Sequence, residues 1–312
     1  MPRLSVILVA YDAGPALVRC VQALAGEGDV QLIVVDNGAG GQELEAVEQL
    51  DGVELLSPGR NLGYAAGSNL GAGKAVGDVL VFLNPDTVAR PGALPKLAAV
   101  LDDPEIGAAM PRLLLLEEPE LLNSDGNTLH LTGLAWVGGH GRPAGRLAET
   151  REIPYASGAA LAIRAELFRD LGGFTEELFL YHEDVELGWR VRLGGLRVVV
   201  APGADLLHDY EFSRNPRKHY YLERNRLVFV LTAYSGRLLA LVAPVLAALE
   251  LAVAVRALRE GWLRQKLAGW AWCVRHADWI RRHRRDVQAG RRVPDRDLAG
   301  LLSATIDPAV LD

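Results

Sequence analysis

The segment FLYHEDVELGWR, residues 179–190, places three carboxylates within four positions, at Glu183, Asp184 and Glu186. Apolar residues four apart predict a helix over 184–193, so the first two acids lie at its N-terminus. The helix dipole favours an ionised carboxylate there, whereas the neighbouring acid disfavours it, and the pair should titrate as a coupled unit. An ionised carboxylate can accept a proton from a hydroxyl group, which is the role of a general base. The alternative is a solvated helix start, and Glu186 needs no other role.

A second group of polar residues follows three apolar runs. These are Tyr11 and Asp12 after the first run, Asp36 and Asn37 after the second, and Asn84 and Asp86 after a later one. Ligands of open α/β sheets bind beyond the carboxyl ends of the strands, so we expect these residues at one edge. Singly, each could cap a helix or form a turn, but together they indicate a site. Because acids repel a bare phosphate, a phosphorylated ligand here implies either a bridging cation such as Mg²⁺ or Mn²⁺ or contacts of the acids to sugar hydroxyls and base edges.

The segment RNLGYAAGSNLGAG, residues 60–73, is rich in small residues. Small side chains let a helix approach a ligand or the sheet closely. Arg60 is a candidate contact to a phosphate or a base, and Asn61 and Asn69 offer amide hydrogen bonds. The alternative is a glycine-rich turn leading to a tightly packed helix. A P-loop is excluded, because Ser68 stands where that motif requires glycine.

The elements that must position these residues alternate between strand and helix patterns. Runs rich in Val, Ile and Leu predict strands at 4–10, 30–36, 53–57, 78–84 and 107–116. The segments between them predict helices at 15–25, 42–50, 65–76 and 91–101. Strands that are apolar on both faces and alternate with helices indicate a parallel sheet covered on both sides. The expected fold class is therefore α/β, with a doubly wound, Rossmann-like, mostly parallel sheet.

The organisation changes after residue 116. Residues 117–152 show no clear period, and a loop this long inside a domain is usually functional or mobile. Beyond it the patterns predict strands at 155–164 and 196–203 and helices at 165–171 and 184–193. From about residue 216 the pattern is helical. We therefore expect one unit at 1–212, with halves 1–116 and 117–212, and a helical extension at 213–312.

The expected extension, residues 213–312, is basic and contains several tryptophans. It holds 18 Lys and Arg against 9 Asp and Glu, whereas the rest of the chain holds 15 against 30, within a net charge of −6. Pro244 and Glu250 interrupt the apolar run 238–255 and argue against a plain membrane-spanning helix. Tryptophans interleaved with arginines over 262–285 are typical of a helix in the headgroup region of a membrane. The alternative is a helical hairpin packed on the α/β unit.

The two cysteines, Cys20 and Cys273, match no metal or redox spacing. Free thiols in a reducing compartment are the simplest interpretation. The apolar N-terminal run lacks the basic stretch and cleavage site of a signal peptide. We therefore expect a cytoplasmic protein, peripheral at the inner face of the plasma membrane, with a membrane surface and no nucleic acid among its partners.

Six motifs occur in order along the chain. They are SVILVAYD, VVDNG, RNLGYAAGSNLG, FLNPDTVARPGAL, YASGAALAIRAELFRDLGGF and FLYHEDVELGWR. Over residues 4–234 the chain resembles glycosyltransferase family 2, and most of all its bacterial rhamnosyltransferase-type members. The resemblance implies a GT-A fold, a divalent cation, and inverting transfer of a rhamnose-like or other hexose from a UDP- or dTDP-sugar. The implied acceptor is a hydroxyl group of a glycan or lipid-linked sugar in cell-surface polysaccharide synthesis.

The resemblance also implies roles for single residues. It assigns the nucleotide-sugar site to Tyr11, Asp12, Asp36, Arg60, Asn61, Asn69, Asn84 and Asp86. Asn84 and Asp86 stand for the DxD motif, with Asp86 as metal ligand and His208 completing the metal site. This chain departs from the pattern in two places. Asp12 stands where the family more often has Asn, and Asn84 replaces the first Asp of a strict DxD.

The remaining implied roles concern the reaction itself. Asp184 resembles the catalytic base, with Glu183 beside it, and Gly158, Trp189 and Arg190 lie where the family shapes the acceptor or diphosphate region. Two other functions compete with this one. A nucleotidyltransferase would need a basic glycine-rich signature just after the first strand, and AYDAGPAL offers none. A non-catalytic, membrane-associated sugar-binding module would differ by failing to hydrolyse a donor.

Overall fold

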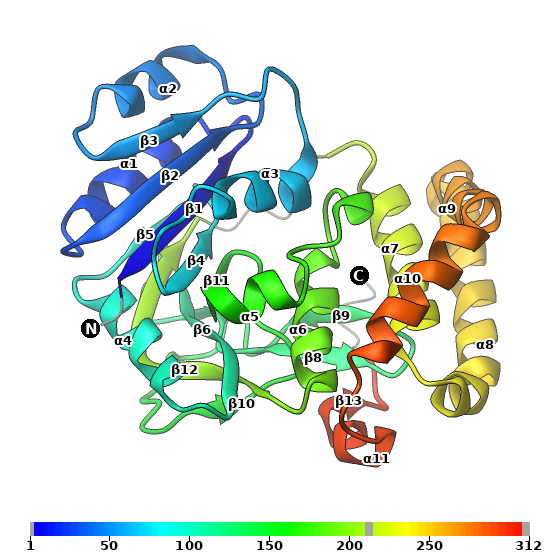
Figure 1. Ribbon diagram of the computed structural model, residues 1–312. Coiled ribbons are helices and arrows are strands. Elements are labelled where there is room, and N and C mark those ends of the chain that lie inside the picture. The colour runs from blue at the N-terminus through cyan, green and yellow to red at the C-terminus, as the bar shows by residue number, and fades with distance from the viewer. Residues whose placement is uncertain (1–2, 210–214, 308–312) are drawn as a thin grey trace.

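The computed structural model describes residues 3–209 and 215–307. The first part alternates strands with helices. Its strands are β1 (Leu4–Ala10), β2 (Val30–Asp36), β3 (Val53–Leu56) and β4 (Val79–Leu83). The helices between them are α1 (Pro15–Ala25), α2 (Gly41–Glu48) and α3 (Gly63–Ala72). The strands pair in parallel in the order β3-β2-β1-β4, and β1 is buried along its whole length because helices cover both faces (Figure 1).

The sheet continues with strands of mixed direction. These are β5 (Thr87–Ala89), β6 (Ile106–Leu115), β7 (Leu122–Ser124), β10 (Arg151–Glu152), β11 (Ala160–Arg164) and β12 (Arg197–His208). The accompanying helices are α4 (Ala93–Ala99), α5 (Ala165–Asp170) and α6 (Glu183–Leu193). Strand β11 lies antiparallel between β4 and β6, and β12 runs parallel to β6. Within the described ranges the sheet has ten strands, and the expected mostly parallel α/β class is confirmed.

The segment expected to lack a period, residues 117–152, contains short strands. Besides β7 and β10 it holds the hairpin β8 (Asn127–His130) and β9 (Ala135–Val137), and β13 (Leu302–Ser303) pairs with β8 to complete a small second sheet. Strands of two to four residues are too short to leave an alternating pattern. The strand expected at 155–164 begins only at Ala160, because Ala160 N–H bonds to the Ser157 carbonyl in a turn at 3.0 Å.

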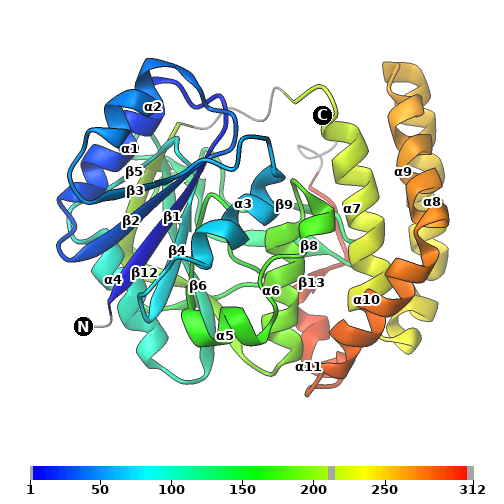
Figure 2. The same ribbon diagram turned by 45° about the horizontal axis from the view of Figure 1, so that its top comes forward.

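Helices make up most of the C-terminal part, as expected. They are α7 (Lys218–Ala233), α8 (Gly236–Glu260), α9 (Leu263–Arg275), α10 (Ala277–Ala289) and α11 (Asp295–Leu298). Figures 1 and 2 show α7 beside α6, with α8 and α9 on its far side. A second hydrophobic core joins the two parts around Trp189, Phe229 and Tyr234. The expected boundary between 212 and 213 lies outside the described residues.

Helix α8 has two unlike faces. Its inner face carries Glu250, which accepts hydrogen bonds from Arg226 of α7 and from Lys266 and Trp270 of α9. Its outer face exposes only Ala, Leu, Val and Pro from residue 238 to 255, a stretch that the structure describes completely. Among the described helices, α8 is the one long and apolar enough to cross a membrane by length and composition. The charge that interrupts the apolar run is therefore turned inward.

The two cysteines are free thiols, as expected. Burial raises the pKa of Cys20 to about 12 and that of Cys273 to about 11. Both thiols therefore stay protonated at neutral pH and lack the nucleophilic thiolate form.

Candidate active site

Polar residues gather where β1 and β2 end. Ala10 lies opposite Asp36 in the parallel pairing, so the residues after β1 share an edge with the end of β2. Asp36 Oδ1 accepts hydrogen bonds from two backbone N–H groups at 3.0 and 3.1 Å. Tyr11 is 59% exposed, and Asp12 has a positive φ of 46°. This edge can present an aromatic ring and two carboxylates to a ligand.

Two asparagines fix the turn that begins α3. Asn37 Nδ2 donates to Asn61 Oδ1 at 3.0 Å, and Asn37 Oδ1 accepts from the Leu62 N–H at 2.6 Å. Gly63 N–H also donates to Asn61 Oδ1, at 2.8 Å. Asn61 therefore shapes the turn at the ligand edge, and exposed Arg60 precedes it. Asn37, which was expected at this edge, thus holds the turn before α3 through its side-chain amide.

The small residues of α3 serve close packing, which was the alternative interpretation of this segment. A Cβ on Gly71 would lie 2.5 Å from Ile7 Cγ2 of β1. Gly63 has a φ of +80°, and a Cβ there would lie 2.5 Å from the carbonyl oxygen of Phe179. The glycines thus let α3 approach both the sheet and the loop before α6.

Asp86 and His208 lie side by side because β5 pairs with the end of β12. His208 is opposite Thr87 in this pairing. His208 Nε2 lies 3.3 Å from Asp86 Oδ1, and its Nδ1 lies 2.8 Å from Asn123 Oδ1. Since a carboxamide oxygen only accepts, Nδ1 of a neutral ring carries the proton, and the Nε2 lone pair faces the carboxylate.

This pair fits a divalent cation. Asp86 Oδ1 is buried and has no hydrogen-bond partner among the described residues. A lone pair and a carboxylate oxygen that face each other both gain from a shared cation. Residues 3–209 and 215–307 contain no group of three or more His, Cys, Asp and Glu that could hold a metal. A bound Mg²⁺ or Mn²⁺ would take its other ligands from phosphate oxygens and water, and would stabilise negative charge on a leaving diphosphate.

Asp184 is connected to the same edge through the turn before β11. Gly158 N–H donates to Asp184 Oδ2 at 2.8 Å. The next carbonyl, that of Ala159, accepts from the Asn84 N–H at 2.9 Å. Two hydrogen bonds through one short turn therefore link Asp184 to the Asn84–Asp86 segment. The turn at residues 157–159 thus connects the backbone before Asp86 with the carboxylate of Asp184.

The two acids at the start of α6, Glu183 and Asp184, differ in their surroundings. Burial raises the pKa of Asp184, although the N–H groups of Gly158 and Val185 oppose this. Burial and the charge of Asp184 raise the pKa of Glu183 well above its usual range. Glu183 Oε2 is buried and has no hydrogen-bond partner within the described part of the chain. Glu183 therefore keeps the proton of the coupled pair, and Asp184 is the acid that can accept one.

Desolvation outweighs the expected lowering of the pKa of these acids by the helix N-terminus. The dipole lowers the pKa of an acid at this position by an amount that corresponds to about 0.3–1 kcal/mol at an exposed site. Desolvation of a buried carboxylate acts in the opposite direction and can exceed it several-fold. The site thus favours a base of raised basicity.

The loop before these acids is strained. Phe179, Tyr181 and His182 have positive φ values of 65°, 68° and 66°. Such conformations cost non-glycine residues about 1–3 kcal/mol each and persist only where the surroundings hold them. His182 Nε2 lies 3.0 Å from the Gly133 carbonyl oxygen, and burial lowers the pKa of His182 to about 4. His182 is therefore neutral and anchors the loop.

Three residues expected in the site make structural contacts instead, and we correct their placement. Asn69 bonds to the backbone of Phe174 at 2.9 Å in both directions. Trp189 is 1% exposed and packs against Phe229 and Tyr234 in the second core. Asn69 thus holds the backbone before α6 and Trp189 fills the second core, so their positions in the motifs reflect structural contacts.

The third of these residues is Arg190, whose guanidinium forms an ion pair with Glu186. Arg190 pairs with Glu186 at 2.7 Å and donates to the carbonyl of Leu171 at 2.5 Å, so its guanidinium is held by structural contacts. Glu186 is 1% exposed rather than solvated. Although burial would raise its pKa, Arg190 and His283 lower it to about 2. The third acid of the motif is a buried structural anion.

Sequence reasoning also missed two groups that orient site residues. Tyr64 OH donates to the Gly158 carbonyl at 2.6 Å, which holds the turn that contacts Asp184. Asn123, in β7, orients His208. Tyr64 lies inside the RNLGYAAGSNLG motif and could have been considered. Asn123 lies in a segment without a periodic pattern and left no signal.

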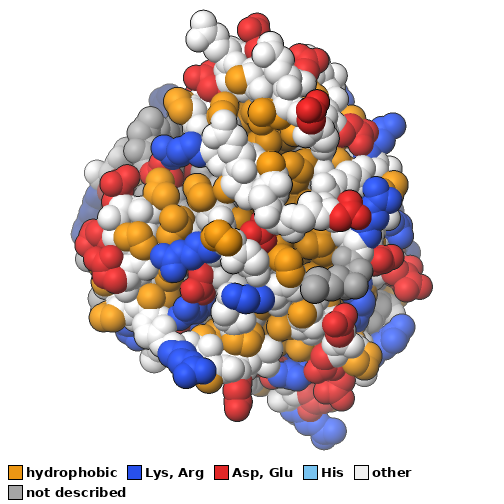
Figure 3. Space-filling view, turned by 90° about the vertical axis from the view of Figure 1, so that its left-hand side faces the viewer, with side chains coloured by type: hydrophobic (Ala, Val, Ile, Leu, Met, Phe, Trp, Pro, Cys, Tyr) orange, Lys and Arg blue, Asp and Glu red, His pale blue; other side chains and the backbone are white. Residues whose placement is uncertain are grey.

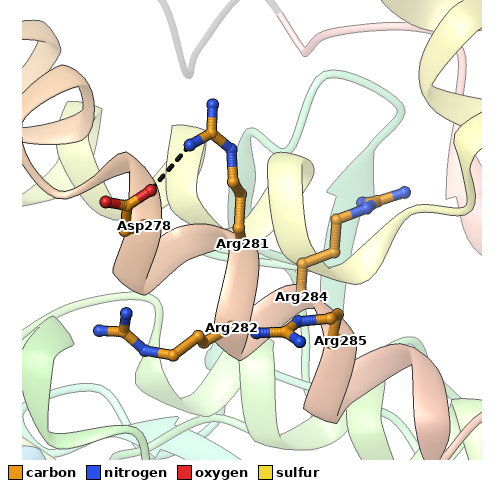
Figure 4. A pocket seen from close by; sticks show the side chains of 5 residues that line it. All are labelled: Asp278, Arg281, Arg282, Arg284 and Arg285. Carbon is orange, nitrogen blue, oxygen red and sulfur yellow. Dashed lines mark hydrogen bonds and ion pairs between the residues drawn. The ribbon is translucent and has the colours of Figure 1, made fainter.

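A surface hollow on α10 does not belong to this site. It is lined by Asp278, Arg281, Arg282, Arg284 and Arg285, all from one helix. Figure 4 shows the arginine side chains spreading in different directions, with Arg281 paired to Asp278 at 2.8 Å. Side chains that diverge from one helix cannot surround a small ligand.

Comparison with known proteins identifies the family. Residues 5–172 match the model of glycosyl transferase family 2. The chain belongs to this family. The match spans the sheet edge and the Gly158 turn, and it decides against a nucleotidyltransferase. The chain is thus a glycosyltransferase.

Two bacterial proteins are among the relatives of this glycosyltransferase. The N-acetylglucosaminyl-diphospho-decaprenol L-rhamnosyltransferase of Mycobacterium tuberculosis is 31% identical over 264 residues, which cover 75% of this chain and 85% of that protein. An O-antigen biosynthesis protein of Myxococcus xanthus is 30% identical over 239 residues, covering 71% of this chain and 19% of that protein. The resemblance to rhamnosyltransferase-type members is confirmed.

Solved structures share the fold. GalNAc-T7, crystallised with UDP, GalNAc and Mn²⁺, gives a TM-score of 0.63 at 17% identity and covers 74% of this chain and 48% of that one. A mannosyltransferase from Pyrobaculum calidifontis, in complex with GDP-Man and Mn²⁺, gives 0.55 at 16% identity, covering 99% and 80%. The expected GT-A fold of this glycosyltransferase is confirmed.

Proposed function

We propose that this glycosyltransferase moves a rhamnose-like or other hexose from a UDP- or dTDP-sugar to a hydroxyl group of a glycan or lipid-linked acceptor, with inversion. The relative from M. tuberculosis is named for rhamnosyl transfer to N-acetylglucosaminyl-diphospho-decaprenol. The nucleotide-sugar site comprises Tyr11, Asp12, Asp36, Arg60, Asn84 and Asp86, with Asn61 shaping the turn. The biological process is synthesis of a cell-surface polysaccharide.

Asp184 acts as the general base. Its carboxylate takes the proton of the acceptor hydroxyl as that oxygen bonds to the anomeric carbon and the bond to the diphosphate breaks. The N–H groups of Gly158 and Val185, each 2.8 Å from one carboxylate oxygen, hold the base in place. Attack from the face opposite the leaving group inverts the anomeric centre. The observation that carries this proposal is the hydrogen-bonded connection from Asp184 through Gly158 and Ala159 to Asn84.

Asp86 and His208 hold a divalent cation in this proposal. Its support is the buried Asp86 Oδ1, which has no hydrogen-bond partner among the described residues, and the His208 Nε2 that faces it. The two fold neighbours crystallised with Mn²⁺ agree with such a site. Asn84 contributes backbone geometry, since its carbonyl accepts from Thr87 Oγ1 at 2.7 Å and its N–H binds the Gly158 turn.

Substitution of Asp184 tests the proposal. We expect Asp184→Asn to lower kcat by about 10²–10⁴, the usual contribution of a general base, with donor affinity unchanged. Turnover with a panel of nucleotide sugars and calorimetric donor binding are the measurements. Asp102→Asn, which changes an exposed carboxylate in the short 3-10 helix Val100–Asp102 after α4, is the control. Full turnover of Asp184→Asn would remove this residue from the role, and a wild-type protein that binds donors without hydrolysing or transferring them would support a sugar-binding module.

The membrane contact in this proposal is made by α8. Its outer face exposes Leu241, Leu251 and Leu258 at 67–70%. Figure 3 shows the opposite side of the molecule, where acidic, basic and apolar side chains are interspersed. The tryptophans of α9 and α10 are partly buried, and Trp272 packs under Arg224 at 4.8 Å. An apolar helix face beside a basic C-terminal part suits the surface of an anionic bilayer at the cytoplasmic side.

A further inference from the structure

Helix α7 reaches the loop that precedes the two acids. This loop, residues 177–182 and hereafter the catalytic loop, ends directly before Glu183. Asn225 of α7 is 0% exposed. Its Nδ2 lies 2.9 Å from the carbonyl oxygens of Leu178 and Leu180 and 2.7 Å from that of Tyr181. One side-chain amide thus gathers three carbonyls of the catalytic loop.

Arg224 fixes the orientation of that amide. Its Nε donates to Asn225 Oδ1 at 2.7 Å, which leaves Nδ2 directed toward the loop. Its Nη2 donates to the carbonyls of Glu177 and Leu178 at 2.8 and 2.7 Å. The guanidinium itself lies 5.1 Å from the Tyr221 ring centre and 4.8 Å from that of Trp272. These contacts come from three separate elements, so the pair has little freedom to move.

The catalytic loop needs such donors. Its left-handed residues turn successive carbonyls away from the bonding pattern of a helix or strand, and buried carbonyls without partners are unfavourable. On the same side, the Phe179 ring stacks on Tyr221 of α7 at 5.2 Å with an interplanar angle of 14°. Helix α7 therefore supplies both the polar and the apolar contacts that keep the strained loop in one conformation.

We propose that Asn225, oriented by Arg224, is a positioning residue that sets the catalytic loop and thereby the place of Asp184. This inference rests on the proposed general-base role of Asp184. Asn225 acts on the base indirectly: it holds the catalytic loop, and the loop leads directly into the first residues of α6, which include Asp184. A displacement of about 1 Å at a reacting group can cost on the order of 10²-fold in rate. The C-terminal part thus contributes to catalysis through α7.

The test compares two buried polar residues of α7. Asn225→Asp keeps the shape and the contact with Arg224 but places a second oxygen against three carbonyls. Thr232→Val is the matched control, because Thr232 is 0% exposed and its hydroxyl bonds only within α7 among the described residues, to Val228 at 2.8 Å and Phe229 at 3.4 Å. Calorimetric titration with UDP or UDP-sugars counts folded binding sites, and kcat is expressed per site.

We expect Asn225→Asp to lower kcat per binding site on the order of 10²-fold, with donor affinity unchanged and Thr232→Val near wild type. A merely structural role would lower the number of sites and leave kcat per site intact, which would overturn the proposal. Should Asn225→Asp fail to fold, Arg224→Lys removes the two-pronged contact while keeping the charge. Its kcat per site should fall in the same way, and an unchanged value would equally overturn the proposal.

Amide hydrogen exchange separates this proposal from the proposed function. We expect exchange at residues 178–184 to be faster in Asn225→Asp than in Thr232→Val, whether or not a donor is turned over. Equal exchange in both variants would show that Asn225 does not hold the loop. A wild-type protein inactive with every donor would instead refute the proposed function, while the exchange comparison still decides the role of Asn225.

Discussion

At the scale of single residues, the chemistry rests on two neighbouring acids with different environments. Both carboxylate oxygens of Asp184 accept a hydrogen bond from a backbone N–H group, whereas Glu183 is buried and its Oε2 has no hydrogen-bond partner within the described residues. Their adjacency in the sequence could be predicted to couple them, but not which one keeps the proton. Which of the two acids keeps the proton depends on their burial and on the hydrogen bond from Gly158, a residue distant from them in the sequence.

Replacement of Glu183 by Gln tests this allocation. Because burial and the charge of Asp184 raise the pKa of Glu183 and Gln mimics the protonated side chain, we expect Glu183→Gln to keep kcat within about tenfold, far from the about 10²–10⁴ loss expected for Asp184→Asn. The measurement is the pH profile of kcat for both variants and the wild type. A loss in Glu183→Gln as large as in Asp184→Asn would show that Glu183 works in its ionised form.

The same variant has a signature in stability. A folded-state pKa raised above the unfolded value stabilises the protein below the unfolded pKa, and this contribution is lost as pH rises through the folded pKa. The wild-type Tm should therefore fall relative to that of Glu183→Gln as pH rises from the usual Glu range, about 4.3, toward alkaline values. Parallel Tm curves for the two proteins would contradict the raised pKa of Glu183.

At the scale of elements, strand ends place the ligand groups. The parallel strands of the first half were predictable, because β1, β2 and β4 are long apolar runs with polar residues directly after them. The pairing of β5 with β12 was not, since β5 has three residues and brings Asp86 to His208 across a large sequence separation. The conformation of the catalytic loop depends on hydrogen bonds from Arg224 and Asn225 of α7 to its backbone carbonyls. Backbone contacts of this kind leave no residue pattern from which they could be predicted.

Substitution of Asp86 tests the role of the β5–β12 pairing. We expect Asp86→Ala to lower Mg²⁺-dependent donor affinity by at least about tenfold, because the cation would lose its carboxylate ligand. Calorimetric donor titrations with and without Mg²⁺ measure this. Asp78→Ala, at the opposite end of β4, is the control. If Asp86→Ala retained the full Mg²⁺ effect, the pair of Asp86 and His208 would not be the metal site.

At the scale of the whole molecule, two cores meet along α6. One surrounds the main sheet, and the other joins α6 to α7, α10 and α11 through residues such as Val185, Phe229, Val287 and Leu298. Removal of the chain after Tyr234 would expose this second core, so point substitutions on the outer face of α8 give a cleaner test of membrane contact than truncation.

Three leucines on α8 carry that test. Burial of a leucine side chain contributes about 1.5–3 kcal/mol, so Leu241→Gln, Leu251→Gln and Leu258→Gln together should lower binding to anionic vesicles by more than about tenfold. Co-sedimentation measures binding, and Val76→Gln, an exposed residue of the first half, is the control. Unchanged co-sedimentation would exclude the outer face of α8 as the membrane contact. If light scattering showed a dimer for the wild type and a monomer for the triple variant, the outer face of α8 would instead be a contact with a second copy of the chain.

The small sheet of β8, β9 and β13 joins the segment 127–137 to the segment 302–303. Its third strand, Leu302–Ser303, pairs with Leu129 and His130. As the polypeptide leaves the ribosome from its N-terminus, domains fold as their parts emerge, yet this sheet is complete only after Leu302 and Ser303 have been made. A translation product that stops before Leu302 would therefore carry the nucleotide edge but lack the third strand of this sheet.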